Sequence, residues 1–272
     1  MKSIFMGKLF KVSADKAFYA VLVIIGGSYV LFIVLLLIAD LQFTSPGHII
    51  QALQSKEIQY SLKLSLLSCT LSMLFSLIVG IPLAYVMTRL EFFGKRLVDT
   101  ILDIPVILPP LVIGLSLLIF FQTAPGSYFE DIFFDVTYAI PGVILAQFVV
   151  ACAFATRTLI VAFKQVPTRA EQVALTLGCN HAQAFYRILL PQAKNGIITA
   201  AALAWARSFG EFGPILIFAG ATRMRTEVLS TSIFLEMSVG HIEVAVAISL
   251  MMLAVSFLVL ILIKSMGEDF RR

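Results

Sequence analysis

The segment 171–191 reads EQVALTLGCNHAQAFYRILLP and separates two long apolar runs of the chain. It carries glutamate, glutamine, asparagine, histidine and arginine, has a glycine in its middle, and ends in ILLP. Such a half-polar stretch stands out in a chain that is 60% hydrophobic. It predicts an ordered segment at a membrane surface and raises the question of what that segment contacts.

The composition is that of a polytopic membrane protein. Only 13% of the residues are charged, the mean hydropathy is +0.98, and the charges cluster between apolar stretches. A helix of about 20 apolar residues crosses a hydrocarbon core about 30 Å thick. The sequence therefore predicts an all-α fold, one domain over 1–272, with six transmembrane helices near 17–39, 60–88, 98–121, 139–163, 195–219 and 242–263.

The first of these runs follows several lysines, as a signal peptide would. Its apolar part exceeds twenty residues, and its end, LIADLQF, does not resemble a cleavage site. We expect a retained helix.

The basic residues give an orientation. They concentrate before the first run, in the loops 89–97 and 164–194, and in the tail, which holds Lys264, Arg271 and Arg272. Because cytoplasmic loops are enriched in Lys and Arg, we expect both termini and the loop 164–194 to lie in the cytoplasm, in a cell (inner) membrane. The net charge of +4 is then a topology signal and does not indicate nucleic acid binding.

The fifth run contains charges at mid-membrane depth. Arg207 and Glu211 lie four residues apart, and Pro214 follows them. A charge at this depth costs roughly 2.5–3.5 kcal/mol, so the two side chains must face protein or water. They are either an internal ion pair or part of a pathway or gate, and because Arg precedes Glu we favour partners on other helices. Pro214 would clash with the carbonyl of Gly210 and predicts a kink there.

Other charges near the ends of the runs receive ordinary interpretations. Arg157 is expected to extend toward the membrane surface. Asp99 and Asp103 are expected to stabilise the amino terminus of the third helix by capping it or by interacting with its dipole. The three cysteines form neither a disulfide framework nor a metal site.

The loop 164–194 has the sequence signals of two short helices. Thr168 and Glu171 are spaced as a capping box, Gly178 predicts a left-handed helix end, and Asn180 with Gln183 predicts a second cap. The apolar faces are Val173, Ala174 and Leu177 in the first helix and Ala184, Phe185, Ile188 and Leu189 in the second.

A lipid-surface helix and a plain connection are the alternatives for this loop. The apolar faces are small and no basic stripe with aromatic anchors accompanies them. We therefore favour a helix–turn–helix that docks into a partner.

This segment resembles the cytoplasmic loop of ATP-binding-cassette importer permeases, whose pattern is Glu-Ala-Ala, three residues, Gly, nine residues, Ile-x-Leu-Pro. Gly178, Ile188, Leu190 and Pro191 match its downstream half. The upstream half departs from it, because Gln172, Val173 and Ala174 occupy the Glu-Ala-Ala positions and Glu171 lies one residue early. The resemblance implies that either Glu171 or Gln172 takes the role of the family glutamate, and that all eight of these residues belong to the ATPase-coupling segment.

A second stretch narrows the resemblance. Residues 207–220, RSFGEFGPILIFAG, are similar to a run in the molybdate and sulfate branch of these permeases. The likeness covers roughly residues 55–265, and it implies transport of molybdate, tungstate or sulfate.

The resemblance also implies the assembly. Two copies of the chain would form the pathway, two ATPase subunits would bind ATP and Mg in the cytoplasm, and an extracytoplasmic binding protein would deliver the anion. ATP binding would draw the coupling segments together and switch the pathway between its two sides.

The sequence contains no catalytic machinery of its own. Gly94-Lys95-Arg96 lacks the rest of a phosphate-binding loop, and His48, His181 and His241 are scattered. We expect no enzyme activity, metal or cofactor in this chain. The alternatives are an ATP-independent secondary transporter or channel, a permease for a different solute, and an integral membrane enzyme.

Overall fold

The computed structural model describes residues 2–268 of the chain, so Arg271 and Arg272 of the basic tail lie outside it. Every regular element in that range is helical, as predicted. In chain order the helices are α1 Lys2–Phe43, α2 Pro46–Gln54, α3 Lys56–Arg89, α4 Lys95–Ile107, α5 Pro110–Gln122, α6 Ala124–Ile132, α7 Ile140–Gln165, α8 Thr168–Thr176, α9 His181–Ala184, η1 Phe185–Leu189, α10 Leu190–Gln192, α11 Lys194–Phe209, α12 Gly213–Phe218, α13 Leu229–Val239 and α14 Ile242–Glu268.

Four of the six predicted spans are single helices long and apolar enough to cross a bilayer. They are Phe18–Phe43 of α1, α3, α7 and Ile242–Ile263 of α14. The predicted third span is the pair α4 and α5, which meet at a bend of 112°. The predicted fifth span is also interrupted, because α11 ends at Phe209 and α12 begins at Gly213. The described residues thus contain four unbroken spans, or five if α4 and α5 count as one.

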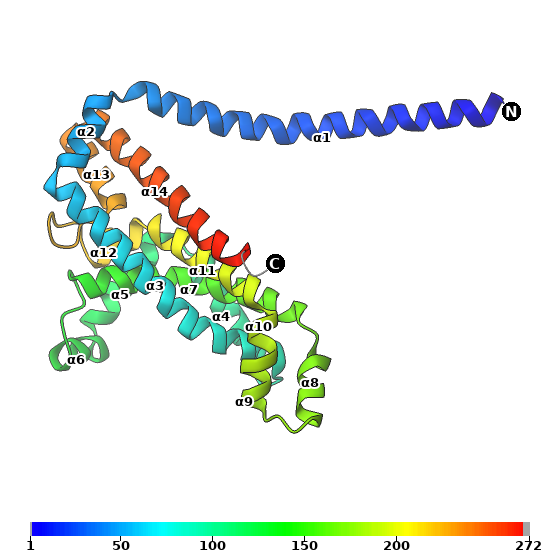
Figure 1. The fold of residues 1–272 in the computed structure, drawn as a ribbon. Helices are drawn as coiled ribbons and strands as arrows, with labels where there is room; N and C mark the ends of the chain where they lie inside the picture. Colours follow the sequence, from blue (N-terminus) through cyan, green and yellow to red (C-terminus); the bar gives the residue numbers. More distant parts are fainter. Residues whose placement is uncertain (1, 269–272) are drawn as a thin grey trace.

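Helices α3, α7 and α11 form the centre of the molecule (Figure 1). Small side chains allow their backbones to approach closely: a methyl group added at Gly196 of α11 would lie 2.2 Å from Cβ of Ala162. A polar contact also crosses this centre, because Ser72 and Ser208 share a hydrogen bond of 3.0 Å between their hydroxyls. The Nε2 of Gln147 donates to the carbonyl of Ser208 at 3.2 Å.

The first helix is placed differently from the others. It projects away from the rest of the molecule (Figure 1), and its most apolar stretch buries none of its residues within the chain. The other helices bring two regions to opposite ends: α2 and α13 lie at the upper end in Figure 1, and α8 and α9 at the lower end.

Candidate functional site

Helices α8 and α9 form a hairpin that projects from the lower end of the bundle (Figure 1). The chain turns at Gly178, whose φ is +91°. This is the left-handed stop that the sequence predicted, and it favours glycine because Cβ strains other residues there. A Cβ at Gly178 would meet nothing within 4 Å, so the backbone conformation alone requires the glycine.

Asn180 begins the second arm as predicted. Its Oδ1 accepts a hydrogen bond from the backbone N–H of Gln183 at 2.8 Å. The Oε1 of Gln183 in turn accepts from the N–H of Asn180 at 3.0 Å. The two residues form a reciprocal capping box, which fixes the direction in which the chain leaves the turn.

The capping box predicted for the first arm is wrong. Helix α8 follows Pro167, and no side chain caps its amino terminus. Glu171 instead points into the protein: it is only 7% exposed, and its Oε1 accepts from Nε of Arg89 at 2.7 Å. A buried carboxylate is stabilised more by a full positive charge than by a backbone N–H. The N–H groups at the start of α8 can bond to water instead, so Glu171 pairs with Arg89.

Arg89 joins three helices at this point. It is the last residue of α3, and its Nη2 donates to the carbonyls of Phe163 at 3.2 Å and Val166 at 2.9 Å. These carbonyls lie at the end of α7, where few backbone N–H groups remain: the carbonyl of Phe163 also accepts from the N–H of Val166 at 3.2 Å. Arg89 thereby fixes α8 to the ends of both α3 and α7.

The second arm packs on the same place. Ala184 and Leu189 are buried, and Phe185 and Ile188 are half-buried, which confirms the predicted apolar face. Tyr85 of α3 lies between the two arms: its ring meets that of Phe185 edge-on at 4.9 Å, and its hydroxyl donates to Oε2 of Glu171 at 3.4 Å.

The remaining residues of the predicted segment point in different directions. Ala174 is buried, whereas Val173 is 57% and Leu177 80% exposed, so the apolar face predicted for the first helix is divided. Gln172 is also exposed. Farther along, Leu190 is half-buried and Pro191 exposed in the short α10, which leads into α11.

The charges of the fifth run form a pair with each other. Nη1 of Arg207 lies 2.5 Å from Oε2 of Glu211, in ion-pair rather than hydrogen-bond geometry. Glu211 is 1% exposed, while Arg207 also lies over the ring of Phe154, 5.6 Å from its centroid. The expectation of partners on other helices is therefore wrong.

The break between α11 and α12 replaces the predicted proline kink. Gly210 caps α11, and Pro214 lies in the first turn of α12, where its missing N–H leaves no bond unmade. The hydroxyl of Ser230 donates to the carbonyl of Glu211 at 2.7 Å. Irregular backbone at membrane depth is stable only where protein or water satisfies it.

This break packs against the break between α4 and α5. A methyl group added at Gly114 of α5 would lie 2.7 Å from Cα of Pro214. One added at Gly213 would lie 3.2 Å from the N of Leu111. Two interrupted helices thus approach each other closely through their backbones.

The interpretations of Arg157, Asp99 and Asp103 are also wrong. Arg157 of α7 lies 2.5 Å from Asp99 and 2.7 Å from Asp103, so it does not extend freely to the membrane surface. Neither acid lies in the first turn of α4. The two carboxylates and the guanidinium instead tie α4 to α7.

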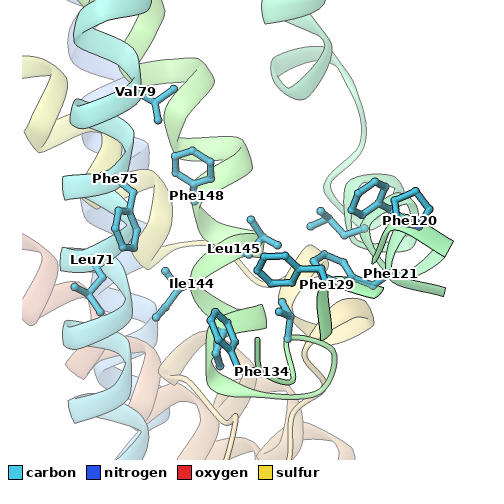
Figure 2. A pocket seen from close by; sticks show the side chains of 14 residues that line it. Leu71, Phe75, Val79, Phe120, Phe121, Phe129, Phe134, Ile144, Leu145 and Phe148 are labelled. Carbon is cyan, nitrogen blue, oxygen red and sulfur yellow. The ribbon is translucent and has the colours of Figure 1, made fainter. Parts of the chain in front are cut away.

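A large cleft elsewhere in the molecule does not suit an anion. It has a volume of about 790 Å³ and lies between α3, α7 and the segment α5–α6 (Figure 2). Phe75, Phe120, Phe129 and Phe148 are among its fourteen lining side chains, all of which are apolar. Because an anion requires hydrogen-bond donors or positive charge, this cleft fits acyl chains or another helix better.

Three residues of the site were missed at the sequence level: Tyr85, Arg89 and Ser230. Arg89 counted only as a topology signal. Glu171 is the one acidic residue in the basic loop 164–194, and this imbalance was the available signal that it needs a basic partner.

The comparisons with known proteins place the chain in a family. Residues 72–272 match the family model described as "Binding-protein-dependent transport system inner membrane component". The chain belongs to this family. This inner membrane component is therefore a permease of the ATP-binding-cassette importers, as the resemblance of its hairpin implied.

Named relatives of this inner membrane component are similar over most of its length. The "Sulfate transport system permease protein CysT" of Salmonella typhimurium is 32% identical over 77% of this chain and 76% of its own. The "Molybdate/tungstate transport system permease protein WtpB" of Pyrococcus abyssi is 38% identical over 58% of this chain and 60% of its own. The crystal structure of a bacterial alginate ABC transporter contains a chain of the same fold, with a TM-score of 0.76, 20% identity and 96% coverage of both chains.

Proposed function

We propose that this permease moves a tetrahedral oxyanion such as sulfate, molybdate or tungstate inward, by alternating access that a separate ATPase subunit drives. The observation that carries the proposal is the hairpin α8–α9, which is exposed at its tip and fixed at its base to α3 and α7 through Arg89 and Glu171. A loop that only connected two spans would not need a buried ion pair at its base. Such a pair stabilises the fold only when its geometry is well satisfied, so its presence indicates that the position of the hairpin matters.

The hairpin is built to transmit displacement. Its first arm is bonded to α3 and α7 through Arg89, and its second arm continues through α10 into α11. Leu189 packs in one cluster with Phe163 of α7 and Ala200 of α11. A partner that moves the hairpin therefore moves the three central helices together, as a rigid body.

The broken spans are the part that this movement would reshape. Helix α11 ends at the break that packs on α5 through Gly114 and Pro214. A shift of α11 changes the contact between the two breaks, so we assign the gate to this region, with Arg207, Glu211 and Pro214 as its candidate residues. ATP binding would draw two hairpins together and open the pathway outward, and product release would reverse the change.

The choice of substrate rests on the relatives and on the charges of the gate. CysT and WtpB are named for sulfate and for molybdate and tungstate. Glu211 compensates Arg207, so the fifth run offers no unopposed cation that would hold a dianion tightly. A weak site suits conduction because tight binding slows release.

The proposed assembly contains two copies of this chain, two cytoplasmic ATPase subunits that bind ATP and Mg, and an extracytoplasmic binding protein. Both termini and the hairpin would lie in the cytoplasm of a cell with an inner membrane, in agreement with the basic residues of the loops 89–97 and 164–194.

Reconstitution in proteoliposomes tests the proposal. The chain is combined with its ATPase and binding protein, and hydrolysis and uptake are compared for molybdate, tungstate, sulfate and a neutral sugar. We expect one oxyanion to stimulate both, and no uptake without ATP. If uptake into proteoliposomes that lack the ATPase is as fast as with it, the chain is a secondary transporter or channel. If only the sugar stimulates hydrolysis and uptake, the substrate belongs to a different class of solute.

A further inference from the structure

The outer face of α8 includes Arg169, Gln172 and Val173, together with Leu177 directly after the helix, and all four are exposed. Successive helix residues are rotated by about 100°, so these four lie on one side and Glu171 and Ala174 on the other. Figure 1 places this helix at the projecting end of the molecule, beyond the ends of the long helices. The outer face is therefore the part of α8 that a partner can reach.

This face has no acidic group. Glu171 is the one carboxylate between residues 164 and 194, and it is buried against Arg89 at 2.7 Å with Tyr85 on its other oxygen. Releasing it would leave Arg89 unpaired beside the end of α7, which is costly for a buried charge. The carboxylate of Glu171 therefore stays paired inside the protein and cannot contact a partner.

The accessible charges of the hairpin are basic. Lys164, Arg169 and Arg187 are exposed, and Gln172 on the outer face is neutral. Beside these charges, Val173 and Leu177 present adjoining apolar surface, 57% and 80% exposed, that a partner could bury.

We infer that the ATPase cleft that receives this outer face has an apolar floor for Val173 and Leu177 and a rim of carboxylates facing Arg169. The inference rests on the proposed function, since it names the chemistry of that ATPase. It excludes recognition through a carboxylate of the permease set against a basic residue of the ATPase. Charge complementarity of this kind fixes register and speeds association.

An anionic lipid surface would also attract basic groups. Against it, the outer face has only two exposed aliphatic side chains, the exposed aromatic of the hairpin, Tyr186, lies on the other arm, and the hairpin projects away from the bundle (Figure 1). The ATPase is therefore the occupant that we assign, and the choice of lipid in the test separates the two.

The test measures the dissociation constant of the purified ATPase subunit for the full permease in phosphatidylcholine nanodiscs. Gln172→Glu is expected to weaken binding by about two- to fivefold and Gln172→Lys to leave it equal or tighter, because one exposed charge contributes modestly. Gln192→Glu is the matched control, since it makes the same change at an exposed position of α10, at the base of the hairpin, and should leave binding unchanged.

Two further variants separate the floor from the rim. Leu177→Ser is expected to weaken binding by roughly ten- to a hundredfold, as loss of a buried leucine does. Arg169→Gln is expected to weaken it less and to make it less sensitive to salt.

The outcomes are distinct. Tighter binding of Gln172→Glu overturns the inference, because it shows a basic rim, while the proposed function stands. Charge effects that appear only when phosphatidylglycerol is added to the nanodiscs show a lipid contact and also overturn it. If the unmodified chain does not bind the ATPase at all, the proposed function itself fails.

Discussion

Arg89 and Glu171 lie 82 residues apart in the sequence and form an ion pair of 2.7 Å between Nε and Oε1. The side chains are 9% and 10% exposed. Because the guanidinium also binds the last carbonyls of α7, this pair is the place where the hairpin becomes part of the central bundle. Whatever acts on the hairpin acts on α3 and α7 through these contacts.

Loss of this pair should uncouple the transporter. Arg89→Ala removes this donor from the carbonyls of Phe163 and Val166 and leaves the carboxylate of Glu171 with only the 3.4 Å bond from Tyr85, and removal of one member of a buried pair costs about 3–5 kcal/mol. We expect the ATPase still to bind and hydrolyse ATP, with several-fold fewer anions moved per ATP. The ratio of uptake to hydrolysis in proteoliposomes measures this effect.

Glu171→Gln is a milder change at the same contact, because the amide oxygen can still accept from Arg89 but the charge is lost. It should reduce the ratio less than Arg89→Ala does. Arg96→Ala is the control, since Arg96 is an exposed arginine in the first turn of α4. An unchanged ratio in Arg89→Ala would show that the hairpin is not driven through this joint.

Gly178 provides a second prediction, which concerns backbone alone. Its φ of +91° is costly for a β-branched residue, by about 1–3 kcal/mol, and less so for asparagine. Gly178→Val should therefore uncouple hydrolysis from uptake while insertion stays intact, and Gly178→Asn should be mild. The space around the glycine is open, so a clash cannot explain the difference.

Equal activity of the two Gly178 variants would contradict this account of the turn. The yield of each variant in the membrane fraction, compared with that of the unmodified chain, separates uncoupling from failed folding.

The fold was predictable where one physical rule decides it. Apolar length fixed α1, α3, α7 and α14, and the second arm followed from the signals at Gly178 and Asn180. These features depend on residues close together in the chain, so local periodicity and capping chemistry suffice to find them.

The rest depends on tertiary contacts that local pattern does not contain. Thr168 and Glu171 have the spacing of a capping box, but the charge of Arg89 competes for the carboxylate and wins because the site is buried. Pro214 predicts a kink where the structure has a full break, since the sequence does not show that the break between α4 and α5 packs against it. Only the assembled helices show that Arg157 meets Asp99.

The contact between the two breaks gives a third prediction. Gly114→Ala puts a methyl group 2.7 Å from Cα of Pro214 and 2.8 Å from its carbonyl oxygen, so one helix must shift. Overpacking of this kind costs about 1–3 kcal/mol. We expect a lower thermal unfolding temperature in detergent and slower uptake, with the ATPase still bound.

Gly26→Ala is the matched control, because a Cβ at Gly26 meets nothing within 4 Å. A Gly114→Ala variant that unfolds and transports like the unmodified chain would show that the two broken helices are not packed as described.

The fourth prediction concerns pH. Glu227 lies in the loop before α13 and is fully buried, and this burial raises the pKa of its carboxyl above the ordinary value, although Ser232 and Arg223 act in the opposite direction. A raised pKa means that the folded state binds the proton more tightly than the unfolded state does. The stability that the protonated form supplies is therefore present below the ordinary pKa and is lost as pH rises through the raised one.

Glu227→Gln should remove this dependence. The amide oxygen can keep the 2.8 Å bond from the hydroxyl of Ser232, and no buried charge forms. We expect the unfolding temperature of the variant to match that of the unmodified chain near pH 4 and to exceed it at about pH 8 by a few degrees, given roughly 1.4 kcal/mol per unit of pKa difference. Glu243→Gln, at an exposed position of α14, is the control. If the unfolding temperatures of Glu227→Gln and of the unmodified chain change with pH in parallel, the carboxyl of Glu227 has the same pKa in the folded and unfolded states, and the prediction is wrong.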